Sequence, residues 1–415
     1  MTRLLELPEI RTLAILSRDG QFLFLTRILR LFAYGLISVV LALYLAQIGV
    51  SEGRIGLLLS LTLAGDAIMS LWITTQADRF GRRRMLLIGT GLMVLAGIVF
   101  SATRSFPVIT MAAIIGTISP SGSEVGPFLP IEQAGLAQTI PDHQRTQIFA
   151  WYNLVGSLAT ACGALIAGGI VGVLQSTGNT PLMGYRAVLL LYALLGGFLF
   201  ALFRQVSPAI EVTQPLAPTN RLGLTRSRGI ILRLSALFAL DSFGGALVVQ
   251  SLVAYWFFIR FNVDTAMIGA IFFSANIFAG LSALVAARVA ARFGLINTMV
   301  FTHIPSNILL MLVPVMPTLP LAVLVLLVRF SISQMDVPTR QSYVMAVVDP
   351  SERSAAAGVT GIARPIGAAC APLLSGVMLG TGWLSLPFFA AGILKIIYDL
   401  ALYKSFRNLK PREES

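Results

Sequence analysis

Residues 31–48 read LFAYGLISVVLALYLAQI, a run without a single charged side chain. A helix of this length and composition can cross the hydrocarbon core of a bilayer. Similar runs recur along the 415 residues, of which 56% are hydrophobic and only 12% charged, with a mean hydropathy of +0.83. Soluble proteins hold about 25% charged residues. The sequence therefore predicts an all-α membrane protein.

Turn residues divide the apolar runs into twelve expected transmembrane helices. The expected ranges are 22–48, 54–77, 84–103, 107–139, 147–174, 185–203, 231–259, 265–287, 295–316, 319–347, 354–379 and 383–403.

The basic residues of the connectors are distributed unequally between the two sides of the membrane. If the N-terminus lies inside, the outer connectors hold only Arg54, Arg104, Arg186 and Arg260, and the remaining connector Lys and Arg lie inside. The positive-inside rule then predicts an even number of spans with both termini in the cytoplasm. It also accounts for the net charge of +12 without nucleic acid as a partner. We expect a multi-pass protein of a bacterial inner membrane.

Two segments of the chain resemble each other. Residues 131–168, IEQAGLAQTIPDHQRTQIFAWYNLVGSLATACGALIAG, align without gaps on residues 339–376, TRQSYVMAVVDPSERSAAAGVTGIARPIGAACAPLLSG. The longest connector, 205–229, contains three prolines and several arginines and resembles a flexible linker. We expect an N-terminal bundle of six helices over 1–204, a cytoplasmic linker over 205–229 and a second bundle over 230–415. Two such bundles can rock about a site held between them.

A short motif lies between the second and third expected helices. Residues 78–84 read DRFGRRR, and a degenerate copy, ARFG, occupies 291–294. The motif resembles the signature of the major facilitator superfamily, although Thr74 stands where a glycine is usual. The resemblance implies twelve helices in two pseudo-symmetric six-helix bundles.

The same motif has a mechanical interpretation. A carboxylate at Asp78 can accept from the N-terminal amides of a neighbouring helix and pair with Arg82. The resemblance implies that this neighbour is helix 11, so that Asp78, Arg79, Gly81 and Arg82 would form a cytoplasmic gate. The alternative is that the arginines only set the topology.

Glycines on helices 5 and 11 also resemble a family pattern. They are Gly156, Gly163, Gly168, Gly169, Gly367 and Gly376. This loosely resembles the glycine-proline motif of drug and proton antiporters in the superfamily. Ala164 occupies the place of the expected proline, which Pro372 supplies in the second half. Close packing through small residues explains the glycines equally well.

Ionisable side chains inside membrane spans are costly and indicate function. The family resemblance implies that helices 1, 4, 7 and 10 line a central cavity. The charged residues of those helices are the candidate pathway residues: Arg27, Arg30, Glu124, Glu132, Asp241, Arg329, Asp336 and Arg340. Pro120 and Pro127 predict a break in helix 4 beside Glu124. Glu124 is therefore the first candidate for a proton or substrate site.

The repeat suggests how two of these charges are paired. Glu132 and Arg340 occupy equivalent positions of the two halves, and we expect a salt bridge between them, either as an inner gate or as a static pair. Asp336 and Arg340 are four residues apart and can pair within one helix.

Four further ionisable residues lie in the second half. Asp241 has no cation near it in sequence, which makes it a candidate proton carrier. Lys395 and Asp399 are expected to pair at their four-residue spacing. We expect His303 to be a hydrogen-bonded packing residue rather than a relay.

These observations favour a proton-coupled secondary transporter of a small organic solute, with export as one direction. A solute uptake permease or facilitator is an alternative, and a polytopic membrane enzyme or a transporter-like sensor represents a different class. With only His143 and His303 and no GxxxxGK[ST] segment, neither metal hydrolysis nor an ATP-driven pump is indicated. We expect no cofactor and no metal; the expected partners are the solute, protons and the lipid bilayer, and the protein is expected to be a monomer.

Overall fold

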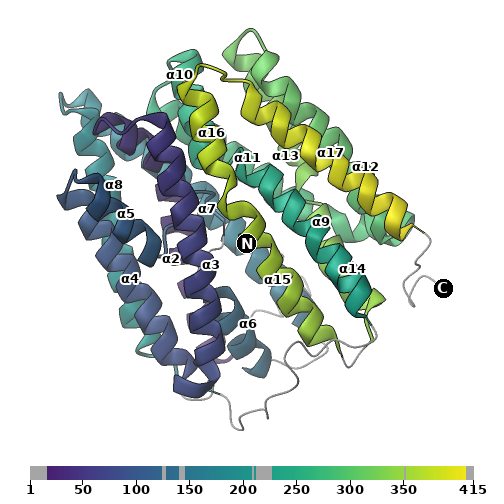
Figure 1. Cartoon of the computed structure of the whole chain (residues 1–415). Coiled ribbons are helices and arrows are strands. Elements are labelled where there is room, and N and C mark those ends of the chain that lie inside the picture. Colours follow the sequence, from purple (N-terminus) through teal and green to yellow (C-terminus); the bar gives the residue numbers. More distant parts are fainter. Residues whose placement is uncertain are drawn as a thin grey trace, which may run out of the picture.

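The computed structural model describes residues 16–123, 128–139, 145–207, 210–211, 227–349 and 352–407. Within these ranges the chain is helical and contains no strand (Figure 1). The helices are α2 (Arg18–Gln47), α3 (Glu52–Phe80), α4 (Arg82–Ala102), α5 (Phe106–Ile115), α6 (Phe128–Thr139), α7 (Arg145–Ser176), α8 (Pro181–Phe203), α9 (Arg228–Ala246), α10 (Gln250–Phe261), α11 (Thr265–Phe293), α12 (Leu295–Leu312), the short η5 (Val313–Val315), α13 (Leu319–Ser333), α14 (Asp336–Val347), α15 (Arg353–Ala369), α16 (Ala371–Gly380) and α17 (Leu386–Phe406).

Eleven helical stretches in the described part of the chain are long and apolar enough to cross a membrane. The remaining expected span, 107–139, consists of α5 and α6 with an irregular segment after Ile115. Pro120 lies in that segment, as the sequence predicted, because proline removes a backbone donor and clashes with the preceding turn. The all-α membrane fold is confirmed.

Three other helices are interrupted where the sequence predicted continuity. α9 and α10 are separated at Leu247–Val249, α13 and α14 at Gln334–Met335, and α15 and α16 at Cys370. No proline marks the first of these breaks. Instead, the Ser251 amide donates to the Pro120 carbonyl at 3.0 Å, and its hydroxyl donates to the Ser38 carbonyl at 3.0 Å. Partners from the other half therefore satisfy polar groups beside the break, and a single segment read alone could not reveal them.

The early and late helices form two groups that lie side by side in Figure 1, purple to teal and teal to yellow. We call the end that holds the connection from α8 to α9 the linker end, and the opposite end, with turns at Gly49, Gly178 and Gly382, the far end. Between the groups, α2 contacts α10, α3 contacts α16 and α7 contacts α11.

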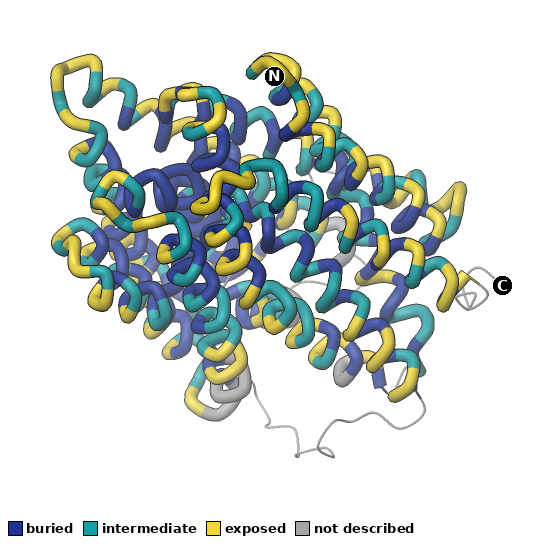
Figure 2. The backbone as a smooth tube through the Cα atoms, turned by 45° about the horizontal axis from the view of Figure 1, so that its top comes forward, coloured by how far each residue is buried: buried dark blue, intermediate teal, exposed yellow. Residues whose placement is uncertain are grey.

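The surface of the helices is strongly apolar. Large side chains such as Ile68, Val173, Phe301 and Ile366 are more than half exposed, whereas the faces between helices are buried (Figure 2). A soluble monomer rarely exposes apolar surface on this scale. The exposed faces fit contact with lipid, and the chain is an integral, multi-pass membrane protein.

The two copies of the ARFG-like motif end in the same backbone conformation. Gly81 and Gly294 have φ angles of 98° and 82°, and each separates two consecutive helices. A side chain with a Cβ rarely adopts such angles, so glycine is required at both turns. The sequence repeat thus corresponds to a repeated sharp turn.

Candidate functional site

A buried salt bridge joins α2 to α6 in the first half. Arg30 and Glu132 form two parallel hydrogen bonds, NH1 to Oε1 at 2.5 Å and NH2 to Oε2 at 2.7 Å, and both side chains are fully buried. The Tyr152 hydroxyl donates to Oε2 of Glu132, and Thr26 Oγ1 donates to Oε1 at 3.1 Å. We call these four residues the N-half cluster. Paired donors in this fork geometry make it a strong and rigid interaction.

A second arginine of α2 packs beside this cluster. Arg27 Nε donates to the Tyr152 carbonyl at 2.7 Å, and NH2 donates to Asn153 Oδ1 at 3.1 Å. Its guanidinium lies 4.2 Å from the Tyr152 ring centroid, a cation–π distance. A Cβ added at Gly156 would lie only 2.8 Å from Arg27 Nε. Gly156, which lies on α7, therefore leaves room for the Arg27 side chain.

The second half holds a larger buried group, which we call the C-half cluster. It consists of Asp241, His303, Asn307, Asp336, Arg340, Lys395 and Asp399. Asp241 is its centre: Oδ1 accepts from Lys395 Nζ, and Oδ2 accepts from Arg340 NH1 at 3.2 Å. The same NH1 donates to Asp336 Oδ2 at 3.0 Å. Two carboxylates thus share one guanidinium nitrogen in a buried site.

His303 and Asp399 form the other part of the C-half cluster. His303 Nδ1 lies 2.8 Å from Asp399 Oδ1, and Asn307 Nδ2 donates to Asp399 Oδ2 at 3.0 Å. His303 Nε2 is 3.9 Å from Asp241 Oδ1, which connects the two parts. Arg364 borders the cluster and donates from Nε to Ser242 Oγ at 3.2 Å.

The expected salt bridge between Glu132 and Arg340 is wrong. Glu132 pairs with Arg30 rather than with Arg340, and Arg340 pairs with Asp241 and Asp336. Equivalent positions of a repeat lie in different halves, and each charge found a partner within its own half. The expected Asp336–Arg340 pair is present.

Lys395 does not pair with Asp399 as the four-residue spacing suggested. It reaches Asp241, and His303 and Asn307 hold Asp399 instead. Asp241 is therefore not a carboxylate without a cation. Sequence reasoning missed Tyr152. It placed His303, Lys395 and Asp399, of the helices expected at 295–316 and 383–403, outside the candidate pathway. The charge of Asp241, which has no cation near it in sequence, was the signal that could have pointed to Lys395.

Other predicted residues lie apart from the clusters. Arg329 of α13 is half-buried and lies 5.0 Å from the Phe330 ring, and its Nε has no hydrogen-bond partner within the described ranges. Glu124 falls outside the described residues, as do the side chains of Asp78 and Arg79. The roles of these three residues stay predictions.

The turn of the sequence motif holds a carboxylate from the connection between the halves. Glu211 Oε2 accepts from the Arg82 amide at 2.6 Å, and Oε1 accepts from the Arg83 amide at 3.1 Å. Arg82 NH1 donates to the Ile210 carbonyl at 2.9 Å. The free amides at the start of α4 thus bind an acidic side chain, as a helix N-terminus favours. This acid comes from the connection between the halves, whereas the sequence prediction had placed Asp78 on the amides of a different helix, helix 11, and had not considered the amides of α4.

Hydrogen bonds join the two halves at the far end. The Tyr255 hydroxyl donates to Glu52 Oε1 at 2.9 Å, and the hydroxyls of Tyr185 and Thr265 lie 3.2 Å apart. These residues lie near the ends of helices that belong to different halves.

Glycines allow the same end to close tightly. A Cβ added at Gly376 would lie 2.4 Å from the Glu52 carbonyl oxygen and 2.7 Å from Gly56 Cα. A Cβ at Gly269 would lie 2.7 Å from the Ala164 carbonyl oxygen. These distances are too short for a real Cβ atom, so the contacts α3–α16 and α7–α11 depend on small residues.

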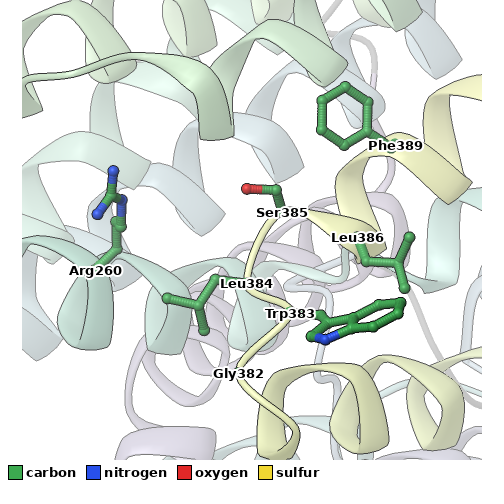
Figure 3. A pocket seen from close by; sticks show the side chains of 7 residues that line it. All are labelled: Arg260, Gly382, Trp383, Leu384, Ser385, Leu386 and Phe389. Carbon is green, nitrogen blue, oxygen red and sulfur yellow. The ribbon is translucent and has the colours of Figure 1, made fainter.

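A pocket of about 360 Å³ opens at the far end between α10 and the turn before α17 (Figure 3). Its lining is Arg260, Gly382, Trp383, Leu384, Ser385, Leu386 and Phe389. Among the residues that the structure describes, Arg260 is the one charged residue that lines this pocket, and no residue of either charge cluster does so. We therefore place the candidate functional site at the clusters.

Comparison with known proteins places this architecture in a family. The family model of the Major Facilitator Superfamily matches residues 23–333 and 234–415. The chain is 32% identical over 419 residues to "uncharacterized membrane protein YJR124C" of Saccharomyces cerevisiae, covering 93% of each chain. It is 26% identical over 134 residues to quinolone resistance protein NorA of Staphylococcus aureus, about a third of each.

Solved structures show the same fold. The nucleoside transporter NupG superposes with a TM-score of 0.72 at 15% identity, covering 94% of this chain and 100% of the other. A D-xylose-proton symporter superposes with a TM-score of 0.70 at 16% identity, covering 92% and 96%. The chain belongs to the Major Facilitator Superfamily, and it is a membrane transporter rather than an enzyme.

Proposed function

We propose that this protein is a secondary active transporter that couples the movement of a small organic solute to protons by alternating access. The halves, proposed to be residues 1–204 and 230–415 joined by 205–229, would rock against each other. The bilayer and the solute are its partners, and it would act as a monomer.

One observation carries the proposal. The contacts that close the far end join the two halves, whereas each buried charge cluster lies within one half. The closure rests on hydrogen bonds and glycine contacts rather than on either buried charge cluster, so it can separate without breaking the salt bridges of the clusters. Each cluster joins helices of one half, so neither cluster is divided when the contact between the halves changes. This separation between contacts that join the halves and clusters that lie within one half suits rigid-body movement of two bundles.

Protons are the proposed coupling ion because carboxylates lie on the expected route. Glu124 is the candidate beside Pro120, and Asp241 and Asp336 are the carboxylate candidates of the second half. Arg340 and Arg329 are pathway candidates that would suit an anionic solute, since a guanidinium does not release its proton. Support for export comes from the similarity of a third of the chain to quinolone resistance protein NorA. Uptake is the alternative direction.

We place the linker end and both termini in the cytoplasm, because the connectors of that end carry most of the basic residues. Asp78, Arg79, Gly81 and Arg82 would then lie at the cytoplasmic gate. The similar protein from yeast removes the reason to restrict the proposal to a bacterial inner membrane.

The test uses purified protein in liposomes loaded with a pH-sensitive dye. A panel of organic solutes is added one by one, and the internal pH is recorded for the wild type, Glu124→Gln and Asp264→Asn. Asp264 is an exposed N-cap of α11, and asparagine caps a helix equally well, so this variant is the matched control.

We expect at least one solute to drive proton movement in the wild type and the control, and Glu124→Gln to abolish that movement while solute exchange continues. Solute movement that is independent of pH in all three proteins would make the chain a facilitator. Full proton movement with Glu124→Gln would remove Glu124 from the route.

A further inference from the structure

His303 has a carboxylate at each ring nitrogen. Nδ1 lies 2.8 Å from Asp399 Oδ1, and Nε2 lies 3.9 Å from Asp241 Oδ1. The side chain is only 5% exposed and packs edge-on against the Tyr398 ring at 6.0 Å. An imidazole whose only role is to pack in the core would not need two carboxylates from two different helices beside its ring nitrogens.

The contact with Asp399 fixes one proton of the ring. If Asp399 is ionised, its carboxylate can only accept hydrogen bonds, and Nδ1 then carries the hydrogen that it donates to Oδ1. Asn307 Nδ2 donates to the other oxygen at 3.0 Å. In the neutral ring Nε2 is then unprotonated, and its lone pair faces the negative Oδ1 of Asp241. A proton on Nε2 would turn this repulsion into an attraction.

The oxygen that Nε2 faces already has a cation. Lys395 Nζ donates to Asp241 Oδ1 and also approaches the Asp241 carbonyl at 3.4 Å. A protonated His303 and Lys395 would therefore compete for one oxygen, while Arg340 keeps the other at 3.2 Å.

The neighbouring helices determine the remaining charge around the ring. The surrounding groups are Asp241 from α9, Asp336 and Arg340 from α14, Arg364 from α15, Lys395, Tyr398 and Asp399 from α17, and Asn307 from α12 itself. With three carboxylates and three Lys or Arg side chains, the group is neutral when His303 is neutral. A bound proton gives it one extra positive charge, which disfavours the three existing cations.

We propose that Nε2 of His303 is a proton-binding site, and that a proton bound there competes with Lys395 for the carboxylate of Asp241. Asp241 lies on α9 shortly before the break at Leu247–Val249, and Lys395 lies on α17. Proton binding thus alters the contact between these helices within the second half. Its part in transport rests on the proposed function, whereas proton binding itself does not.

The chain offers a direct test because it contains two histidines. His143→Gln leaves His303 as the single histidine. The protein is labelled with ¹⁵N in the imidazole ring, placed in lipid vesicles and followed by solid-state NMR from pH 5 to pH 9. We expect a neutral ring with hydrogen on Nδ1 at high pH and a doubly protonated ring at low pH. A ring in one protonation state throughout this range overturns the proposal.

Two variants test the competition. Lys395→Met should raise the ratio of protonated to neutral His303 at a fixed pH, because the cation that competes for Asp241 Oδ1 is gone. Asp241→Asn should lower that ratio, because the carboxylate that Nε2 faces is gone. Lys404→Met, at an exposed position of the same helix, should leave it unchanged. An equal ratio in Lys395→Met and Lys404→Met would refute the competition.

The liposome assay separates this site from the proposed function. If His303 titrates but His303→Gln has the same pH dependence of transport as the wild type, the proton site stands and its coupling to transport fails.

Discussion

The N-half and C-half clusters occupy related helices but differ in composition. The first is one carboxylate, Glu132, bound by Arg30 from the first helix of its half. The second reverses the charges, because Arg340 stands at the equivalent position and binds Asp241 from the first helix of its own half. This reversal shows that the repeated position requires a buried ion pair but does not require a particular sign of charge.

The clusters also differ in how completely their carboxylates are paired with hydrogen-bond donors. Glu132 has fixed donors on both oxygens, from Arg30, Thr26 and Tyr152. In the C-half cluster Arg340 and Lys395 share Asp241, and a histidine lies between two carboxylates. The first cluster has one arrangement, and the second can exchange partners. We therefore expect the first to be structural and the second to respond to protons.

The largest expected effect is the loss of the single carboxylate of the N-half cluster. Glu132→Gln removes the buried carboxylate that Arg30 binds through two hydrogen bonds, and we expect the free energy of unfolding to fall by roughly 3–5 kcal/mol. Asp336→Asn should cost less, about 1–3 kcal/mol, because Arg340 keeps Asp241. Denaturant titration in detergent measures both. Equal losses would show that the two clusters do not differ in redundancy.

Removal of one hydroxyl tests how much the neutral donors contribute. Tyr152→Phe deletes a hydrogen bond to an ionised group and should cost about 1.5–3 kcal/mol. Tyr185→Phe deletes a bond between two hydroxyls at the far end, where about 0.5–1.5 kcal/mol is expected. The same titration compares the two. If Tyr185→Phe lowered the free energy of unfolding more than Tyr152→Phe, the Tyr152 hydroxyl would not be an important donor to Glu132.

A third prediction concerns the contact between the halves, where glycines allow the helices to approach closely. A Cβ at Gly168 would lie 2.7 Å from the Thr265 carbonyl oxygen, whereas nothing lies within 4 Å of one at Gly169. Gly168→Ala should disfavour far-end closure by about 1–3 kcal/mol, the usual cost of overpacking. Spin labels on the two halves should then show a longer distance at that end for Gly168→Ala but not for Gly169→Ala. No difference between these neighbours would exclude a tight contact.

The smallest expected effect is at the linker end, where the halves differ again. Glu211 of the connection caps α4, whereas Glu352, within the second half, accepts from the Ser227 amide at the start of α9 at 2.9 Å. Glu211→Gln should cost about 0.3–1 kcal/mol, the usual value for a charge at a helix end. Proteolysis of the connection should become faster in Glu211→Gln. An unchanged cleavage rate would show that Glu211 does not hold the connection in place.

Sequence reasoning predicted the spans and the helix 4 break well because length, hydropathy and proline act locally. It failed for the break between α9 and α10, where Ser251 finds its partners in the other half. It also failed for pairings such as Glu132–Arg340, because the repeat shows equivalence but not proximity. Helical spacing suggested Lys395–Asp399, yet a buried Asp241 from another helix was the stronger partner.

The sequence by itself determined that this chain is a helical, multi-pass membrane protein with two related halves. The length of each apolar run and the repeated segments are properties that can be read along the chain without its three-dimensional structure. Only the tertiary structure decided which charge neutralises which. In a buried site each ion needs a partner within hydrogen-bond distance, and that distance is set by how α2, α6, α9, α14 and α17 pack together. The same packing places His303 between Asp241 and Asp399, which no spacing along the chain indicates.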